Sequence, residues 1–370
     1  MKINENRMIK NFMELVKIDS LAGKEKEIAL RLKKVLTKMG AKVSFDNAGG
    51  KTGGNTGNLI AKFKGTRKGK PFILSAHMDT VGPGENIKPI LKTGRIISDG
   101  TTVLGADCKG GIAIILEIIQ VLKENKLPYP PIEVVFTVSE EVGLLGARFL
   151  DYSKLKAKYG MIFDSEKALN QVTANAPAAD RIEIEIYGKA SHAGAAPESG
   201  ISAIRVAAEA ISQMKLGKID FETTANIGMI NGGNATNVIT PLVKMTGEAR
   251  SHNLDKLERQ SEHMRKEIEK AAKKAKAKFK FKVHREFHNL QIKPTDTVLK
   301  LITLAMKDMG MKMQPIASGG GTDANVFYKH KIKTPIIATG MKEVHSVKEY
   351  LLLKEFFNAA ILTLKVISKL

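Results

Sequence analysis

The residues best suited to chemistry are His77 and Asp79, which follow a largely apolar stretch at residues 72–76. Such a short apolar run predicts a buried strand. Side chains two positions apart on an extended segment point to the same side, so Asp79 can reach back to one ring nitrogen of His77. The other nitrogen would then face a metal, because a metal-bound histidine almost always donates its second N–H to such a partner. A surface histidine beside a turn aspartate is the plainer interpretation of this pair.

More acidic and histidine residues follow other predicted strands or lie in loops next to them. They are Glu140 and Glu141 after the strand at 132–138, Asp164 after 161–163, His345 after 335–338, and Asp107 before an apolar helix. In open α/β sheets, functional sites form at the edge where the carboxyl ends of the strands lie. We therefore expect these side chains to converge at one edge of one sheet. For Asp107, a first-turn acid that stabilises a helix N-terminus is the alternative.

Histidines and carboxylates without a thiol cluster form a mixed nitrogen and oxygen ligand set, which suits zinc, manganese or cobalt. Two such ions, about 3.5–4 Å apart, need a bridging carboxylate, and Asp107 is the natural candidate. Of the adjacent residues Glu140 and Glu141, one would bind a metal and the other would take a proton from the attacking water. These residue types therefore predict metal-assisted chemistry on water.

The flanking segments predict a domain that mixes helices and strands. Residues 5–19 and 24–39 have the apolar spacing of amphipathic helices. Strands expected at 43–45 and 58–64 flank a turn-rich stretch at 47–55. Together with the strand that ends at His77, these elements indicate an α/β fold.

The middle of the chain predicts a second, smaller domain. Its expected elements are a strand at 181–187, a helix at 202–215, strands at 226–230 and 242–250, a helix at 254–275 and a strand at 279–284. The order β-α-β-β-α-β is the ferredoxin-like arrangement. We therefore predict a catalytic domain formed by residues 1–177 and 288–370, interrupted by an inserted α+β domain at 178–287.

The composition narrows the classes of partner and compartment. The net charge is +21 and the pI is near 9.7, which would suit a polyanion. Because the lysines are spread along the whole chain, we interpret them as a solvated surface and expect no specific nucleic-acid partner. The single cysteine excludes an internal disulfide and favours a reducing compartment. No apolar signal segment is evident at the start, and the apolar stretch at 112–122 is too short to span a bilayer, so we expect a cytoplasmic protein without a membrane partner.

Ordered motifs along nearly the whole chain resemble one known family. The motifs are SAHMDTV, GADCKGG, TVSEEVGLLGA, FDSE, ASHAGAAPESG and HSVKEYL. They resemble the M20 family of dinuclear zinc metallopeptidases. The segment GGGTDAN at 319–325 resembles the tripeptidase (peptidase T) branch of that family. No single motif decides the matter, but the ordered set is highly specific.

The resemblance implies a ligand set for two zinc ions, with manganese or cobalt as alternatives. One ion would be held by His77 and Asp164 and the other by Glu141 and His345. Asp107 would bridge the two ions. The family usually has Asp or Met after the bridging aspartate, and the peptide bond between them is typically cis. Here that position is Cys108, whose thiol could ligate, oxidise or pack, and we expect it to pack.

The resemblance also implies catalytic and substrate-binding roles. Glu140 would be the general base, Asp79 would orient His77, and His192 would stabilise the oxyanion. The inserted domain would serve as a lid and would form a homodimer. The residues that would contact a small peptide substrate are Asn237, Arg250, Gly320, Gly321 and Thr322. For Arg250, a salt bridge at a strand edge is the alternative.

The expected activity is that of an aminopeptidase that cleaves small peptides, in particular tripeptides. The first alternative is an amidohydrolase of the same family, either an N-acyl-amino-acid deacylase or a carboxypeptidase, because the same ligands serve those substrates. An alternative of another class is a basic binding protein that keeps a peptidase fold without catalysis. The presence of Glu140 and of the complete ligand set speaks against that class.

Overall fold

The computed structural model describes residues 2–370, which form two compact units. The first unit contains the chain up to Asn175 together with Gln291–Ser318 and Thr322–Leu370. The second contains Ala176–Leu290 and Gly319–Gly321. The middle segment expected at 178–287 falls inside the second unit, whereas its role as a lid or dimerisation domain stays a prediction.

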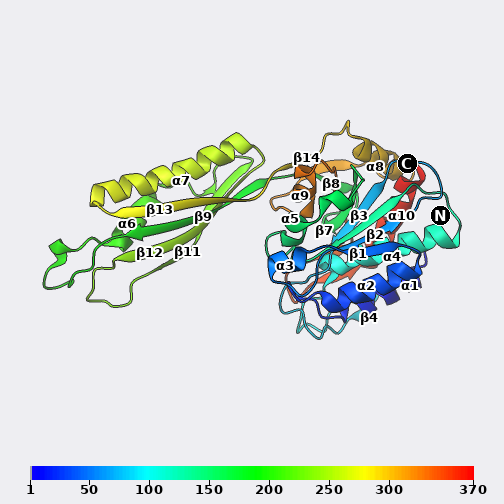
Figure 1. Cartoon of the computed structure of the whole chain (residues 1–370), viewed down its shortest axis with the longest axis horizontal. Helices are drawn as coiled ribbons and strands as arrows, with labels where there is room; N and C mark the ends of the chain where they lie inside the picture. Colours follow the sequence, from blue (N-terminus) through cyan, green and yellow to red (C-terminus); the bar gives the residue numbers. More distant parts are fainter. Residues whose placement is uncertain (1) are drawn as a thin grey trace. The chain divides into compact units, whose positions relative to one another are not determined.

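A large mixed sheet organises the first unit (Figure 1). Its strand order is β1-β2-β6-β3-β7-β16-β8-β14, and β15 pairs with β8. The strands are β1 (Lys42–Phe45), β2 (Leu59–Phe63), β3 (Phe72–His77), β6 (Ile132–Thr137), β7 (Gly160–Ser165), β8 (Gln171–Ala176), β14 (Leu290–Gln291), β15 (Gln314–Ala317) and β16 (Ile336–Ala338). Because β6, β3, β7 and β16 are parallel neighbours, their carboxyl ends lie at one edge of the sheet.

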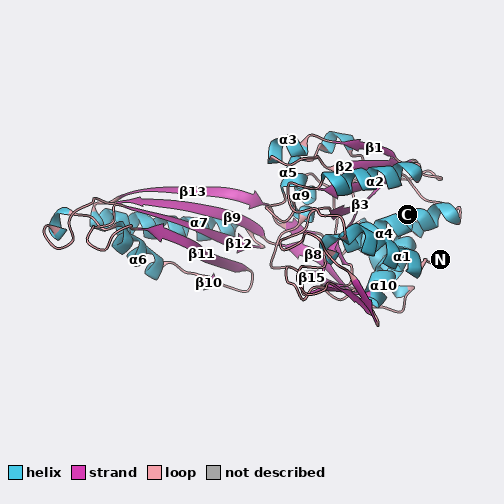
Figure 2. Ribbon diagram, turned by 90° about the horizontal axis from the view of Figure 1, so that it is seen from below, coloured by secondary structure: helices cyan, strands magenta, loops and turns pink. Residues whose placement is uncertain are grey.

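Every residue of β3 and β6 is buried, which is typical of parallel strands covered on both faces. The helices of this unit are α1 (Glu5–Val16), α2 (Lys26–Lys38), α3 (Ala48–Thr52), α4 (Ala106–Glu124), α5 (Leu145–Phe149), α8 (Thr297–Lys307), α9 (Asp323–Lys329), α10 (Leu353–Ser368) and the 3₁₀ turn Tyr152–Lys154. Helix α4 packs on β3 and β7, α1 and α10 pack on α4, and α2 packs on β1 and β2 (Figure 2).

One glycine allows α4 to approach the sheet closely. A Cβ atom at Gly111 would lie 2.7 Å from the carbonyl oxygen of Phe163 and 3.1 Å from the Cβ of Ala76. A larger residue would therefore push the first turns of α4 away from β7 and β3. The close contact keeps Asp107, at the start of the helix, beside the carboxyl ends of these strands.

Local structure differs from the sequence prediction in three places. Within the turn-rich stretch expected at 47–55, residues Ala48–Thr52 form the short helix α3, because Asp46 accepts a hydrogen bond from Ala48 N and Gly53 ends the helix with φ 77°. Helix α1 ends at Val16 rather than near 19. The strands β4 (Ile90–Lys92), β5 (Arg95–Ile97), β17 (Met341–Lys342) and β18 (Tyr350–Leu352) form a small sheet that was not expected.

The second unit has the predicted β-α-β-β-α-β order with a short additional strand. Its elements are β9 (Ala178–Tyr187), the 3₁₀ turn Pro197–Ser199, α6 (Ala203–Gln213), β10 (Gly217–Lys218), β11 (Thr223–Gly232), β12 (Leu242–Ser251), α7 (Leu254–Ala275) and β13 (Lys278–Phe287). The sheet order is β10-β11-β12-β9-β13. Alternate residues Ile182, Ile184 and Ile186 of β9 are buried in a core that includes residues of α6 and α7.

Across residues 2–370, no helix combines the length and the apolar character that a membrane crossing would require.

Candidate metal centre and active site

The predicted metal ligands of the first unit lie together at the carboxyl edge of its parallel strands. They are His77 at the end of β3, Glu141 in the loop after β6, Asp164 in β7, Asp107 at the start of α4, and His345 between β17 and β18. Groups of their nitrogen and oxygen atoms lie within 4.8 Å of one another. The convergence predicted from the strand ends is therefore present in the structure.

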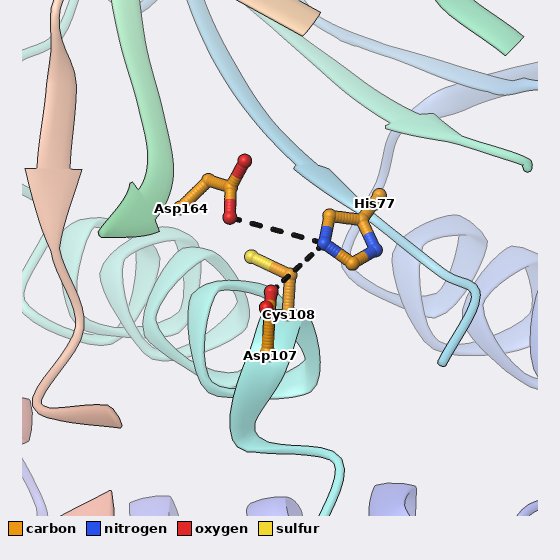
Figure 3. A group of neighbouring side chains, drawn as sticks. All are labelled: His77, Asp107, Cys108 and Asp164. Carbon is orange, nitrogen blue, oxygen red and sulfur yellow. Dashed lines mark hydrogen bonds and ion pairs between the residues drawn. The ribbon is translucent and has the colours of Figure 1, made fainter. Parts of the chain in front are cut away.

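His77 and two carboxylates form the more buried part of this site (Figure 3). The Nε2 atom of His77 lies 2.9 Å from Oδ1 of Asp107 and 3.9 Å from Oδ1 of Asp164. The peptide bond between Asp107 and Cys108 is cis, as the resemblance implied. The buried Cys108 thiol donates a hydrogen bond to the carbonyl oxygen of Phe163, and its sulfur lies close enough to these ligands to join the group.

Asp107 faces a histidine with each of its two carboxylate oxygens. Its Oδ1 atom contacts His77, and its Oδ2 atom lies 3.3 Å from Nε2 of His345. The same Nε2 atom lies 3.0 Å from Oε1 of Glu141. Asp107 thus stands between two groups of donors, which is the placement that a bridging carboxylate needs.

The charges of the site suit bound cations. Within the described residues 2–370, none of the four carboxylates Asp107, Glu140, Glu141 and Asp164 pairs with a lysine or an arginine at ion-pair distance. Burial and the neighbouring Asp164 raise the pKa of Glu140 well above its ordinary value. Hydrogen bonds to Asp107 and Glu141 raise the pKa of His345 to about 10. The buried negative charge and the mixed N/O donors fit a pair of divalent ions.

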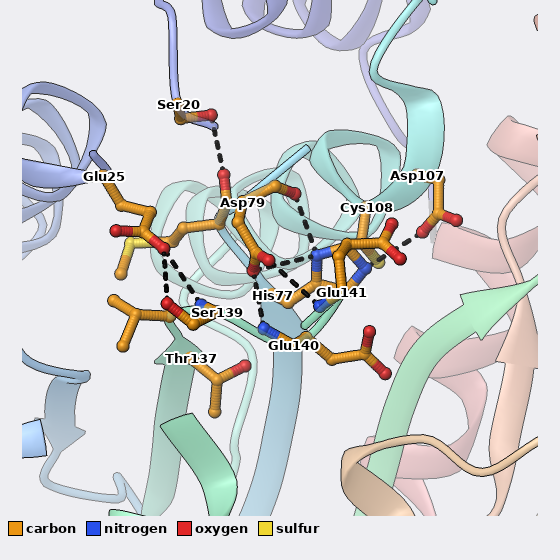
Figure 4. A network of polar contacts seen from close by, with 12 residues as sticks. Ser20, Glu25, His77, Asp79, Asp107, Cys108, Thr137, Ser139, Glu140 and Glu141 are labelled. Atoms are coloured by element: carbon orange, nitrogen blue, oxygen red, sulfur yellow. Dashed lines mark hydrogen bonds and ion pairs between the residues drawn. The ribbon is translucent and has the colours of Figure 1, made fainter. Parts of the chain in front are cut away.

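Asp79 holds the two adjacent glutamates in place (Figure 4). Its two carboxylate oxygens accept hydrogen bonds from the backbone N–H groups of Glu140 and Glu141, each at 3.0 Å. The nearest partner of His77 Nδ1 is instead the backbone oxygen of Asp79 at 3.0 Å, and the Asp79 carboxylate is 3.5 Å away. The difference arises because β3 ends at His77, so the side-by-side rule of extended segments does not apply beyond it.

Several buried polar residues near the site had no role in the sequence prediction. Glu349 accepts hydrogen bonds from the backbone N–H groups of Leu104, Gly105 and Asp107 at 2.7, 2.8 and 3.0 Å. Lys109 is fully buried and donates to the carbonyl oxygen of Ile18 at 2.8 Å. Both residues stand inside motifs recognised in the sequence, Glu349 four positions after His345, and this spacing was the available signal.

In the second unit, the loop that carries His192 is well defined by hydrogen bonds. Nδ1 of the exposed His192 ring accepts from the backbone N–H groups of Gly194 and Ala195 at 3.2 and 3.1 Å. A neutral ring therefore carries its proton on Nε2, where it can be donated to a ligand. The N–H of Ala193 donates to the carbonyl oxygen of Asn237 at 2.9 Å, which places Asn237 beside this loop.

Arg250 and the glycine segment lie together in the second unit. Arg250 pairs with Glu248 at 2.9 Å and donates to the carbonyl oxygen of Gly319 at 3.3 Å. Next to Gly320, Gly321 packs on the ring of Phe287, where a Cβ atom would lie only 2.3 Å from a ring carbon. Thr322, the following residue, belongs to the first unit, and its side chain caps α9 by accepting from Ala324 N at 3.2 Å.

The structure does not bring Asn237 and Arg250 of one chain together. Arg250 lies eight residues beyond Leu242 along β12, a distance of about 26 Å at roughly 3.3 Å per residue. Strands β9 and β12 pair as far as Tyr187 and Leu242, and the residues beyond that end continue the pairing. There Ile239 N donates to Ser191 O, and Ala193 N donates to Asn237 O. This continuation leads away from Arg250. His192 and Asn237 therefore lie at the end of this sheet opposite to Arg250.

Comparison with known proteins agrees with this site. The family described as Peptidase family M20/M25/M40 matches residues 73–369. The chain belongs to this peptidase family. The M20/M25/M40 match includes every candidate ligand, and it makes the protein a peptidase, a hydrolase of peptide bonds, in a family that includes dinuclear metal-binding members.

Two solved structures and one further relative are similar over almost the whole chain. Aminopeptidase PepT from Bacillus cereus ATCC 10987 is 40% identical with a TM-score of 0.94, and 99% of each chain is covered. A tripeptidase from Staphylococcus aureus subsp. aureus Mu50 is 37% identical with a TM-score of 0.96, covering 99% of this chain and 98% of that one. The uncharacterized protein YqjE of Bacillus subtilis strain 168 is 38% identical, again with 99% of each chain covered.

Proposed function

We propose that this M20/M25/M40 peptidase is a cytoplasmic, dinuclear zinc aminopeptidase that removes the N-terminal residue of small peptides, chiefly tripeptides. The observation that carries the proposal is the position of Asp107, with one oxygen facing His77 and the other facing His345. Similarity to a PepT aminopeptidase and to a tripeptidase over 99% of this chain supports the substrate class. Manganese or cobalt would fit the same ligands.

The proposed ligand set assigns His77 and Asp164 to one ion and Glu141 and His345 to the other. Asp107 would contribute an oxygen to each ion. When bound, such ions polarise the scissile carbonyl and lower the pKa of water. The buried Glu349 accepts three backbone hydrogen bonds from the loop of Asp107 and so keeps Asp107 in position.

Glu140 is the proposed general base. Asp79 fixes the backbone of Glu140, and burial raises the pKa of the Glu140 carboxyl, so this side chain is suited to accept a proton. Glu140 takes the proton of the attacking water and delivers it to the leaving amine. His192 donates its Nε2 proton to the oxyanion that develops on the carbonyl oxygen.

The proposed substrate contacts are those that the motif resemblance implies. Arg250 would bind the C-terminal carboxylate of the peptide, with Gly320, Gly321 and Thr322 lining the adjoining backbone. Because a tripeptide spans at most about 11 Å, it cannot reach both Arg250 and the His192 loop of the same chain. We therefore propose a homodimer formed through the second unit, in which His192 of the partner subunit, together with Asn237 of the partner subunit, completes each site.

A panel of peptides tests this function. Free, N-acetylated and C-amidated forms of the same di- and tripeptides would be incubated with the protein and added zinc, manganese or cobalt. The proposal expects fastest cleavage of free tripeptides, with release of the N-terminal residue. Preferred turnover of the N-acetylated peptides would instead indicate a deacylase. Release of the C-terminal residue would indicate a carboxypeptidase.

A further inference from the structure

The segment that joins α1 to α2 contacts residues near three of the candidate site positions, namely His77, Asp107 and the pair Glu140 and Glu141. Ser20 donates to the carbonyl oxygen of Met78 at 2.8 Å, next to His77. Ile18 accepts from the side chain of Lys109, two residues after Asp107. Glu25 contacts Ser139, the residue before Glu140 (Figure 4). The family match begins only at residue 73 and so assigns nothing in this segment.

Glu25 is a fully buried acid whose side chain is turned toward Ser139, at the start of the loop that carries Glu140 and Glu141. Its Oε1 atom accepts from Ser139 N at 2.9 Å, from Ser139 Oγ at 3.1 Å and from Gly23 N at 2.8 Å. Glu25 occupies the N-cap position of α2, yet its side chain makes no capping hydrogen bond to that helix. Capping of its own helix therefore does not explain why a carboxylate is buried here.

Ser139 needs a partner of this kind because of its backbone conformation. Its φ is 51°, in the left-handed region that residues with a side chain rarely occupy. This conformation turns the chain sharply as it leaves β6 and sends the next two residues toward the ligands. Glu25 holds Ser139, and Asp79 holds the N–H groups of Glu140 and Glu141. Two buried carboxylates thus fix three consecutive backbone amides.

We propose that Glu25 is a positioning residue that places Glu140 and Glu141 by holding Ser139 in its left-handed conformation. Glu25 acts through Ser139, and its hydrogen bonds go to Ser139 and Gly23 rather than to Glu140 or Glu141. The inference rests on the proposed roles of Glu140 as base and Glu141 as metal ligand. It adds a residue before the family match to the machinery that keeps these side chains in place.

Glu133 provides a matched control on the same strand. It is buried, and its carboxylate accepts from the backbone N–H groups of Lys156 and Ala157 at 3.0 and 2.9 Å. It stands near the start of β6, whereas Ser139 follows the end of that strand. Loss of the Glu133 side chain removes a buried carboxylate that accepts from backbone N–H groups, as Glu25 does, but leaves the contacts of Ser139, Glu140 and Glu141 intact.

The experiment compares Glu25→Ala, Glu25→Gln, Glu133→Ala and Glu133→Gln with the wild type, each fully loaded with cobalt. Three quantities are measured: the visible absorption spectrum of the bound cobalt, kcat and KM for a tripeptide, and the melting temperature. We expect Glu25→Ala to change the cobalt spectrum and to lower kcat by about 10²-fold, the scale for a misplacement of roughly 1 Å, with little change in KM. The melting temperature should fall in both alanine variants.

Glu25→Gln keeps the shape and one acceptor oxygen but loses the charge, so its kcat should fall by about 3- to 10-fold, since charged hydrogen bonds are roughly twice as strong as neutral ones. Both Glu133 variants should keep the wild-type kcat and cobalt spectrum. If Glu25→Ala does not fold, the comparison of Glu25→Gln with Glu133→Gln decides. An unchanged kcat and spectrum in Glu25→Gln, or an equal loss of kcat in the Glu133 variants, would overturn the proposal. A wild type that binds cobalt but cleaves no peptide would refute the proposed function, and the cobalt spectra would still test Glu25.

Discussion

A mixture of two inactive variants should recover a defined fraction of the activity. The first variant, Glu140→Gln, lacks the proposed base but keeps His192. The second, His192→Ala, keeps the base but lacks the proposed oxyanion donor. Each homodimer should be nearly inactive, because every one of its sites lacks one of the two groups. The variants are chosen so that a mixed dimer can combine the intact half of each.

The expected recovery follows from the geometry of the second unit. His192 lies at the end of the sheet opposite to Arg250, and the β12 residues between them span about 26 Å, far beyond the length of a tripeptide. Under the proposed homodimer, a site that uses Arg250 takes His192 from the partner subunit. In a mixed dimer, the site with an intact Glu140 receives the intact His192, and the other site receives neither. Random reassociation makes about half of all dimers mixed, so roughly a quarter of the wild-type kcat should return if the sites are independent.

The assay is dissociation of the two variants in mild denaturant, joint refolding with zinc, and measurement of tripeptide cleavage. Heterodimer formation is followed in parallel by mass spectrometry of one isotope-labelled variant. A mixture of wild type and Glu140→Gln, treated in the same way, controls for losses during refolding. If heterodimers form in the expected amount and no activity returns, His192 does not act across subunits and the reasoning from the sheet is refuted.

Three further outcomes are expected. Glu140→Gln should bind two metals as the wild type does and lose about 10²–10⁴-fold in kcat, the usual contribution of a general base. Glu141→Gln, which changes the proposed ligand, should lose metal. Loss of metal from Glu140→Gln instead would show that the two roles are reversed. Arg250→Ala should lower kcat/KM for peptides with a free C-terminal carboxylate, by an amount equivalent to about 1.5–3 kcal/mol of binding free energy. The kcat/KM for C-amidated peptides should be nearly unaffected. An equal loss on both kinds of peptide would make Arg250 a structural residue. Chelation should abolish activity, and elemental analysis of the reactivated protein should find about two metals per chain, whereas full activity with one metal would contradict the dinuclear site.

The fold and the convergence of the ligands were predictable because both depend on features that repeat along the sequence. Buried parallel strands appear in the sequence as short apolar runs, and the residues that follow them lie at one edge of the sheet. The helix predicted at 254–275 has the same bounds in the structure, since its apolar spacing and its cap at Asn253 agree. By contrast, β10, β17 and β18 contain two or three residues, which is too short for any alternation to be visible.

The supporting residues could not be predicted, because their partners leave no mark in the sequence. Glu25 accepts from a backbone amide 114 residues away, and Glu349 from one 242 residues away. A backbone N–H is present at every position except proline, so the identity of the partner carries no information. The Asp79 carboxylate lies 3.5 Å from His77 Nδ1, within the reach that the sequence predicted. Its hydrogen bonds to the two backbone amides after a different strand could not be predicted for the same reason.

The contacts of Glu349 have a consequence for the order of events during synthesis. Translation proceeds from the N-terminus, so the loop of Asp107 leaves the ribosome long before Glu349, 242 residues later, can hold it. His345, which also contacts Asp107, is made at the same late stage. A nascent chain therefore carries Asp107 without two of its partners, and the proposed ligand set is complete only when the final part of the protein has been made. Under the proposed function, a peptidase built in this way stays silent while it is being made.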